Sequence, residues 1–215
     1  MLRTPGRLRR LAQVSLLALA LPLLATGCGQ SDPPAGVGSS GGAPTPSASS
    51  AGFTGKWSKL AATCPALTGA AATSLRKTGP GTPSAADADT PLAQNVNCTW
   101  GEGTGSVGVS LYLNRSDGPL PADQATAQEF QQGFDKYVQD GSTLHWKPEP
   151  GLEEKAYLGI HKDRVTIELF VLSSNARFTV FYQVKELDEA AWDAALAQHR
   201  DTMRGLAADV LDDLG

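Results

Sequence analysis

The chain has 215 residues, of which 41% are hydrophobic, so it is long and apolar enough to build a hydrophobic core. Its 22 aspartate and glutamate residues outnumber its 18 lysine and arginine residues, which gives a formal net charge of −4. Because nucleic-acid-binding domains present a basic face, this acidic balance argues against nucleic acid as a partner.

The amino terminus has the pattern of an export signal. Residues 1–27 contain four arginines and no acidic residue, and an apolar run from Leu11 to Leu24 follows the arginines. That run is shorter than the roughly 20 apolar residues of a membrane-spanning helix. A charged region before a short apolar one is typical of signal peptides. We predict a signal peptide over residues 1–27, cleaved between Gly27 and Cys28.

The residues at the expected cleavage site resemble the lipobox of bacterial lipoprotein signals. Small residues precede a cysteine in Ala25-Thr26-Gly27-Cys28, although Ala25 stands where the lipobox prefers leucine. The resemblance implies a thioether-linked diacylglycerol on Cys28 and an amide-linked acyl chain such as palmitate. Two or three such chains hold a protein stably on a membrane. In the alternative, an ordinary secretory peptide is cleaved after an A-x-A-like site and Cys28 has no special role.

The segment after the cysteine has the composition of a tether. From Gly29 to Gly52 it is rich in Gly, Ser, Pro and Ala, with Asp32 as its one charge. Such a segment buries too little apolar surface to offset its ordering entropy. We therefore expect residues 28–52 to be a disordered tether with a typical reach of roughly 27 Å. The expected location is the outer face of the cytoplasmic membrane, with the lipid on Cys28 as the anchor.

Processing would make the protein more acidic. Removing four of the 18 basic residues and none of the 22 acidic ones leaves a formal net charge of −8. This charge argues against a second, electrostatic attachment to anionic lipid.

Two cysteines, Cys64 and Cys98, remain once Cys28 is lipidated. An even pair outside the cytoplasm favours a disulfide, which would stabilise the fold by roughly 4 kcal/mol. A metal-binding pair and a reactive thiol are the alternatives. No Cys or His lies at ligand spacing near either residue, so we predict the disulfide and no metal site or cofactor.

The remaining residues, 53–215, are predicted to form one extracytoplasmic domain that begins with short helical pieces. These are expected over Lys56–Ala62 and Pro65–Lys77, and the composition of Thr78–Pro91 indicates a loop. Strands are then expected at Asn95–Trp100 and Ser106–Asn114, around a hairpin turn Gly101–Gly105. A helix over Pro121–Gln139 is predicted by its apolar stripe Ala127, Phe130, Phe134 and Val138.

Three more strands and a closing helix complete the prediction. The strands are expected near Lys155–His161, Arg164–Ser173 and Arg177–Lys185, joined by tight turns at Lys162-Asp163 and Ser174-Asn175. The helix is expected from Asp188, as its N-cap, to about Asp212. The order αββαβββα, with strands joined by tight turns, predicts an α+β fold in which helices pack on an antiparallel sheet of about five strands.

One face of this predicted sheet is unusually apolar for a solvent-facing surface. Alternation places Tyr112, Phe170, Leu172 and Phe181 on the side opposite the main core positions. Either helices cover both faces, or a groove on this face receives a ligand. Tyr112, Phe170 and Phe181 are therefore a candidate binding face, and Trp146, in the sequence HWKPEP, is a candidate for its rim together with His145.

Catalytic motifs are weak in this sequence. The G-x-G-x-x-G pattern of Gly103–Gly108 opens an alternating strand, whereas a dinucleotide fingerprint opens a helix, so we interpret it as a hairpin turn. The sequence has no G-x-S-x-G, and its histidines His145, His161 and His199 are scattered. The expectation is a protein that is not an enzyme and has no catalytic residues, with an unrecognised hydrolase as the less favoured alternative.

Several short motifs together resemble a group of actinobacterial lipoproteins with a domain of unknown function. They are the lipobox, the Ser/Pro/Gly tether, a cysteine in the opening Trp57–Leu67, Cys98-Thr99-Trp100, and the segment Gly151–Tyr157 followed by paired strands around Asn175. The resemblance implies an exported, disulfide-bridged α+β domain without an established enzymatic role. The functional expectation is a lipid-anchored envelope protein that binds a small amphiphile or a protein partner, or else a scaffold subunit of an envelope complex.

Overall fold

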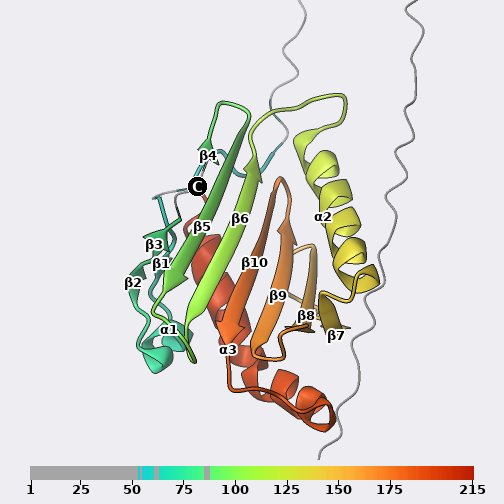
Figure 1. Ribbon diagram of the computed structural model, residues 1–215. Helices are drawn as coiled ribbons and strands as arrows, with labels where there is room; N and C mark the ends of the chain where they lie inside the picture. The colour runs from blue at the N-terminus through green and yellow to red at the C-terminus, as the bar shows by residue number, and fades with distance from the viewer. Residues whose placement is uncertain (1–52, 54, 61–62, 85–87) are drawn as a thin grey trace, which may run out of the picture. The chain divides into compact units, whose positions relative to one another are not determined.

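An antiparallel sheet dominates the computed structural model, which describes residues 53, 55–60, 63–84 and 88–215 (Figure 1). The predicted signal peptide, Gly27, Cys28 and the tether to residue 52 lie outside the described residues. The strands and helices are β1 (Ala66–Leu67), α1 (Ala70–Leu75), β2 (Gly79–Pro80), β3 (Thr82–Pro83), β4 (Ala88–Asp89), β5 (Ala93–Trp100), β6 (Val107–Asn114), α2 (Ala122–Gln139), β7 (Thr143–Pro148), β8 (Lys155–His161), β9 (Thr166–Ser173), β10 (Ala176–Gln183), the 3-10 helix η1 (Glu189–Ala191) and α3 (Trp192–Asp212).

The order of strands in the sheet is β3-β5-β6-β10-β9-β8-β7, and β4 also pairs with β5. Every pair in it is antiparallel, while β1 and β2 form a separate pair. The predicted α+β class is confirmed, but the prediction of about five strands was too low. It missed β7 and the two-residue strands β3 and β4, so αββαβββα lacks one full strand after α2. Only the first residue of β7 is buried, so this edge strand shows no alternation that a pattern could detect.

The opening of the domain differs most from the prediction. No helix forms over Lys56–Leu60, the described part of the first expected helix. The Ser58 and Lys59 amides instead bond to the carbonyl oxygen of Gly215, and Leu60 forms a β-bridge with Leu214. In the second expected helix, only Ala70–Leu75 is helical, because Ala66–Leu67 pairs with β2. Tertiary contacts with the chain's end thus override local helix propensity here.

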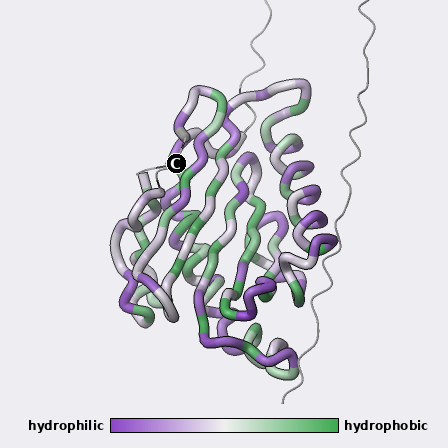
Figure 2. Tube along the Cα trace, viewed as in Figure 1, coloured by the Kyte–Doolittle hydropathy of each residue, from purple (hydrophilic) through white to green (hydrophobic). Residues whose placement is uncertain are grey.

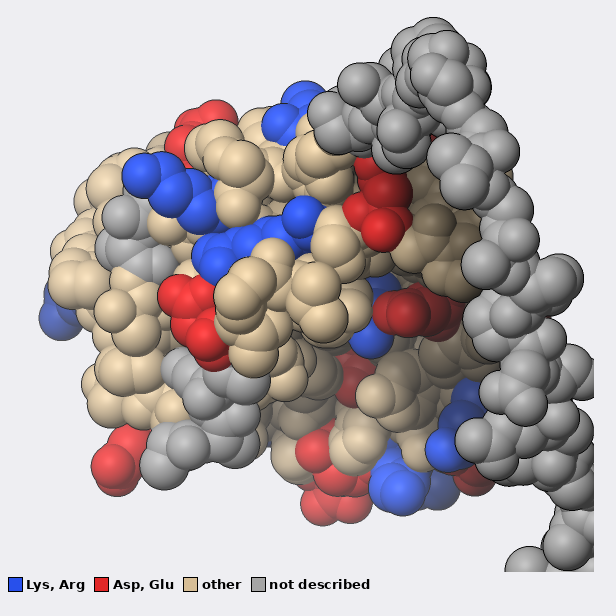
Figure 3. Space-filling model, turned by 90° about the horizontal axis from the view of Figure 1, so that it is seen from above, with Lys and Arg blue, Asp and Glu red and all other residues tan. Residues whose placement is uncertain are grey.

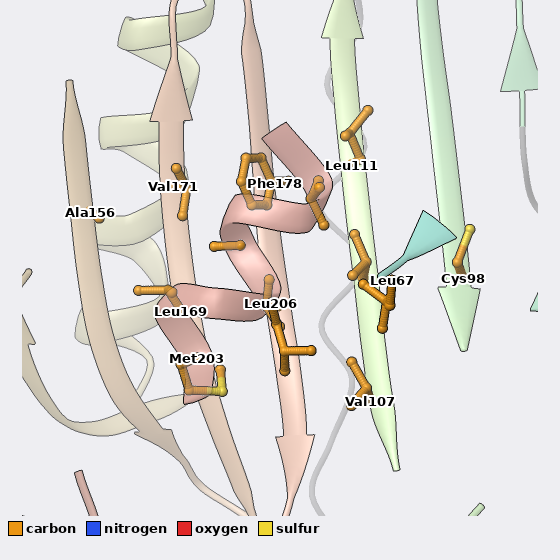
Figure 4. Close-up of a cluster of buried hydrophobic side chains, with 14 of the residues drawn as sticks. Leu67, Cys98, Val107, Leu111, Ala156, Leu169, Val171, Phe178, Met203 and Leu206 are labelled. Carbon is orange, nitrogen blue, oxygen red and sulfur yellow. The ribbon is translucent and has the colours of Figure 1, made fainter. Parts of the chain in front are cut away.

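Helix α3 covers one face of the sheet and forms the main core with it. Met203 and Leu206 lie among Leu169, Val171 and Phe178 of the strands (Figure 4). Burial alternates along β6, and Val107, Val109, Leu111 and Leu113 are all buried on this face. Figure 2 shows many hydrophobic residues along these strands, whereas α2 is largely hydrophilic.

The closing helix begins later than predicted and without the predicted cap. A short 3-10 helix, η1, follows Asp188, and α3 itself starts at Trp192. Asp188 makes no side-chain capping bond. One side of α3 faces the core, since Leu196, Met203, Leu206 and Val210 are buried.

The cysteine pair joins the irregular opening segment to the sheet. Cys64 and Cys98, in β5, form a disulfide with an S–S distance of 2.08 Å, and both residues are buried in the main core. This is the pairing that the sequence predicts. It fixes the segment before β1 against one side of the sheet.

The surface at the end of the sheet near the β9–β10 turn carries both signs of charge. Figure 3 shows basic and acidic side chains interspersed over this end of the described residues. Lys56 lies 3.7 Å from Glu153, and Arg115 pairs with Asp89. Exposed pairs of this kind contribute little to stability.

Candidate functional site

The second face of the sheet is only partly covered by a helix. Helix α2 lies on the side of the sheet opposite α3 (Figures 1 and 4). Phe130 and Phe134 of α2 pack with Phe170 and Leu172 of β9 in a second buried cluster, and Phe134 stacks on Tyr157 at 4.0 Å. Helix α2 therefore covers the β8–β9 side of this face, and the β10–β6–β5 side is left open.

A groove lies beside α2 on this face, with a volume of about 360 Å³. Three of the four predicted binding-face residues, Tyr112, Phe170 and Phe181, line it. The wall toward the helix is formed by Phe130, Phe134 and Tyr137. The alternation that placed those three aromatic side chains on one face thus located a real concavity.

Two further hollows continue from the groove across the sheet. One has a volume of about 290 Å³ and the other of about 250 Å³, and Phe181 lines both of them as well as the first. Glu168 and His161 line the first and second hollows, and Ser110 lines the first and third. The open face therefore carries one branched trough with the Phe181 side chain at its centre.

The strand register explains how this centre is built. Gly159, Glu168, Phe181 and Gly108 are successive partners on β8, β9, β10 and β6. Alternation along antiparallel strands turns their side chains to the same face. A glycine therefore flanks Glu168 on one side and Phe181 on the other, so neither side chain has a side-chain neighbour from the glycine position beside it.

Glu168 is the most unusual residue of the groove. It is the one charged residue in β9, all eight residues of which are buried, and its own exposure is 5%. The Thr143 hydroxyl donates a hydrogen bond of 3.0 Å to its Oε2. Burial raises the pKa of Glu168 to about 7, although nearby His161 and the bond from Thr143 act in the opposite direction. This carboxyl group can therefore change its charge near neutral pH.

Glycine at position 159 makes the contact between Thr143 and Glu168 possible. A Cβ atom at Gly159 would lie 2.7 Å from Cγ2 of Thr143 and 3.0 Å from the carbonyl oxygen of His145. The Thr143 side chain occupies that space instead and reaches Glu168 across the intervening strand β8. The site thus depends on the absence of a side chain at residue 159.

A histidine and an aspartate stand beside Glu168 at the end of the trough. His161 Nδ1 lies 3.1 Å from Asp163 Oδ2. Burial raises the pKa of Asp163, but hydrogen bonds from the Val165 amide and the Thr166 hydroxyl outweigh that effect and lower it. Asp163 is therefore a stable carboxylate engaged by its own turn.

The opposite end of the groove carries a basic residue that is already paired. Arg177 Nη2 lies 3.5 Å from Glu129 Oε2, and its guanidinium lies 4.7 Å from the centre of the Tyr112 ring. Burial and the charge of Glu129 raise the pKa of Tyr112, and Arg177 partly opposes them. Tyr112 is therefore a neutral hydrogen-bonding group in this wall at physiological pH.

The predicted rim around Trp146 is not formed. Trp146 lies on β7 and contacts the rings of Phe134 and Tyr157 edge-on, and it is not among the residues that line the groove. His145 is instead on the α3 side, with its Nε2 atom 2.8 Å from Asp193 Oδ1. The two neighbours point to opposite faces because the segment is a strand rather than a loop. Trp146 supports the wall of the groove from behind and remains 38% exposed.

The groove also contains a serine, which bears on the hydrolase alternative. Ser142 lines it together with His161. The side chain and amide of Ser142, however, bond to Asp140 and lower the pKa of that carboxyl. Among the described residues no hydrogen bond joins Ser142 to His161, so this serine is not arranged as an activated nucleophile.

The acidic centre of the groove was not predicted from the sequence. Glu168, Thr143 and His161 come from three different strands, and no motif connects them. The available signal was the glutamate itself, because a charge in the middle of the apolar strand TIELFVLS needs either a partner or a function.

Among residues 53, 55–60, 63–84 and 88–215, no group of three or more His, Cys, Asp or Glu residues is placed to hold a metal ion. Comparisons with protein-family models, with curated proteins and with solved structures find no significant match.

Proposed function

We propose that this chain is a lipid-anchored protein of the cell envelope whose domain binds a small amphiphilic molecule in the groove beside α2. The observation that carries the proposal is the incomplete cover of the second sheet face. Tyr112, Phe170 and Phe181 line a hollow of about 360 Å³ there, which is within the size range of small-molecule sites.

The chemistry of the lining favours a molecule with both apolar and polar parts. Aromatic rings from α2 and the sheet form one side, while Ser110, Thr179 and Glu168 supply polar groups. A purely structural sheet face would be covered or uniformly polar. A scaffold subunit would in addition need a broad flat surface, whereas this face is hollowed.

The membrane attachment is the second part of the proposal. It rests on the lipobox-like Ala25-Thr26-Gly27-Cys28 and on the resemblance to actinobacterial lipoproteins. None of the helices among the described residues is long and apolar enough to cross a bilayer. The anchor in this proposal is the lipid on Cys28, with no contribution from the domain.

Native mass spectrometry of the protein purified from membranes tests the ligand. A co-purifying species of a few hundred daltons is expected in the wild type and should be lost in Phe181→Ala. Leu120→Ala, an exposed apolar residue that lines none of the three hollows, is the matched control. Detection of the apo mass alone in every preparation would contradict ligand binding.

A separate experiment tests the anchor. Replacement Cys28→Ser should prevent lipidation and release the protein from the membrane fraction, as measured by mass analysis of the amino-terminal peptide and by fractionation. Membrane association that survives this replacement would contradict lipid anchoring through Cys28.

A further inference from the structure

The centre of the groove contains a buried carboxyl group, that of Glu168, which receives only one hydrogen bond from the described residues. Burying a charged or polar group is costly unless its hydrogen bonds are made. Glu168 is 5% exposed and accepts one bond, from Thr143 to Oε2. No second donor to this carboxyl group is found among the described residues. Such an arrangement leaves a hydrogen-bonding position for a molecule in the groove.

The charges around Glu168 favour a cation there over an anion. The nearest titratable groups are His161 on β8 and Asp163 in the following turn, and Asp163 keeps its negative charge through its own hydrogen bonds. Arg177, the basic residue that lines the groove, lies farther along β10 and pairs with Glu129. Helix α2 contributes Tyr137 to this wall. A ligand carboxylate would face two acidic groups at this end, whereas an ammonium group would be attracted by both.

The neighbouring aromatic side chain fits the same kind of ligand. Phe181 is the direct partner of Glu168 in the β9–β10 register. Gly108 lies on its other side, where an added Cβ would only touch the ring, 3.5 Å away. The ring is thus accessible from the trough, and an aromatic face attracts both apolar groups and cations.

We propose that the groove binds a primary amine, whose ammonium group pairs with Glu168 while its apolar body lies against Phe181 and the phenylalanines of α2. This inference rests on the proposed ligand-binding function and specifies its ligand. A primary ammonium group supplies the hydrogen-bond donors that Glu168 lacks. A quaternary ammonium group supplies none and should bind more weakly.

Binding of an amine is coupled to the protonation of Glu168. The ammonium group pairs with the ionised carboxylate, so it must displace the proton that Glu168 holds below about pH 7. His161, Asp163, Arg177 and Glu129 are the other acidic and basic groups that line the trough, and none of them lies as deep as Glu168. The affinity for an amine is therefore expected to rise as the pH increases from about 6 to about 8.

Three probes of similar shape test the inference: phenethylamine, phenethyl alcohol and hydrocinnamate. Each is titrated by ligand-observed NMR at about pH 8 against the full chain in phosphatidylcholine nanodiscs, with empty nanodiscs as the reference. The amine should bind at least about tenfold more tightly than the alcohol, the ratio expected for one charge-assisted hydrogen bond. Hydrocinnamate should bind most weakly.

Two variants assign the preference to Glu168. In Glu168→Gln the ratio between amine and alcohol should fall to about threefold or less, while Glu102→Gln, at an exposed glutamate that lines none of the three hollows, should keep it. Calorimetry at about pH 6 in buffers of different ionisation enthalpy should show proton release on amine binding in the wild type and none in Glu168→Gln.

The outcomes separate this inference from the proposed function. Equal binding of all three probes that is lost in Phe181→Ala would overturn the amine and leave the groove as a site for apolar molecules. An amine preference that persists in Glu168→Gln would also overturn it. Failure of all three probes to bind would count against the ligand-binding groove itself.

Discussion

The hydroxyl group of Thr143 donates a 3.0 Å hydrogen bond to the Glu168 carboxyl group across Gly159, which separates them on the intervening strand. This contact joins an edge strand to a central strand and holds a buried acid in the floor of the groove. Thr143 donates the bond and Glu168 accepts it, and residue 159 must be a glycine for the two side chains to meet.

The first prediction concerns the pH dependence of stability. The pKa of Glu168 is raised to about 7 in the folded protein, so between about pH 4.5 and 7 the folded state binds more protons than the unfolded state. The stabilisation that the protonated Glu168 gives to the folded state is then fully present below about pH 4.5 and is lost as the pH rises through about 7. Glu168→Gln should therefore stabilise the protein by about 3 kcal/mol at pH 8 and change little at about pH 4.5.

Urea unfolding of wild type and variant at several pH values measures this difference. Glu129→Gln is the control, since its side chain is exposed and should show no such pH-dependent difference. A constant difference between Glu168→Gln and wild type across the whole range would contradict the assigned pKa shift.

The second prediction concerns the glycine between the two strands. Gly159→Ala places a methyl group 2.7 Å from Cγ2 of Thr143, so Thr143 must move and its bond to Glu168 is lost. We expect a destabilisation of about 2–3 kcal/mol, measured as a shift in the urea midpoint.

A second substitution distinguishes a steric clash from a general effect of alanine. Thr143→Ser removes Cγ2 but keeps the hydroxyl, so the double variant Gly159→Ala/Thr143→Ser should recover at least about 1 kcal/mol relative to Gly159→Ala alone. Strict additivity of the two changes would show that Thr143 is not the obstacle.

Sequence patterns predicted the strands and helices whose burial alternates. The stripe of α2 and the alternation in β6 and β10 were recognisable because one face of each packs on a core. The same alternation placed Tyr112, Phe170 and Phe181 on one face, and they do line the groove. Periodicity thus carries information about which face a side chain occupies.

The parts that could not be predicted depend on long-range contacts. β7 is an edge strand with little burial, so TLHWKP has no pattern. The opening segment does not form a helix, because its Ser58 and Lys59 amides hydrogen-bond to the carbonyl oxygen of Gly215. Glu168 and Thr143 are 25 residues apart and meet only through the register of β7, β8 and β9. No local pattern specifies such a register.

The third prediction concerns Asn175, a fully buried residue in the turn between β9 and β10. Its Nδ2 donates to the carbonyl oxygens of Trp57, at 2.8 Å, and Asn114, at 2.6 Å, and its Oδ1 accepts from the Trp57 amide at 2.9 Å. Asn175→Ala leaves these groups unpaired and should cost about 3 kcal/mol. It should also accelerate hydrogen exchange of the Trp57 amide.

The variant Asn175→Asp separates the donor from the acceptor role. It keeps an acceptor for the Trp57 amide but at neutral pH turns a carboxylate toward two carbonyl oxygens. Its destabilisation should therefore be at least as large as that of Asn175→Ala at about pH 7 and smaller at about pH 4, where the protonated acid can donate. Equal stability of wild type and both variants would remove Asn175 as the link between the opening segment and the sheet.

The fourth prediction concerns the disulfide between Cys64 and Cys98, which are 34 residues apart. The segment from Thr63 to Leu67 contains no helix and is tied to the sheet by this bond, while β1 pairs only with β2, outside that sheet. Loss of the cross-link frees a loop in the unfolded state and should destabilise the protein by about 4 kcal/mol. Urea unfolding of the oxidised and the reduced wild type measures that loss without any change of sequence.

The double variant Cys64→Ala/Cys98→Ala then distinguishes the cross-link from packing. Both sulfur atoms are buried beside Val109 and Leu67 in the main core, so the variant should lose the same energy as reduction plus about 1 kcal/mol for the removed volume. Reduction should leave it unchanged. If reduction of the wild type shifted the urea midpoint by much less than the double substitution did, core packing rather than the cross-link would be what holds the opening segment on the sheet.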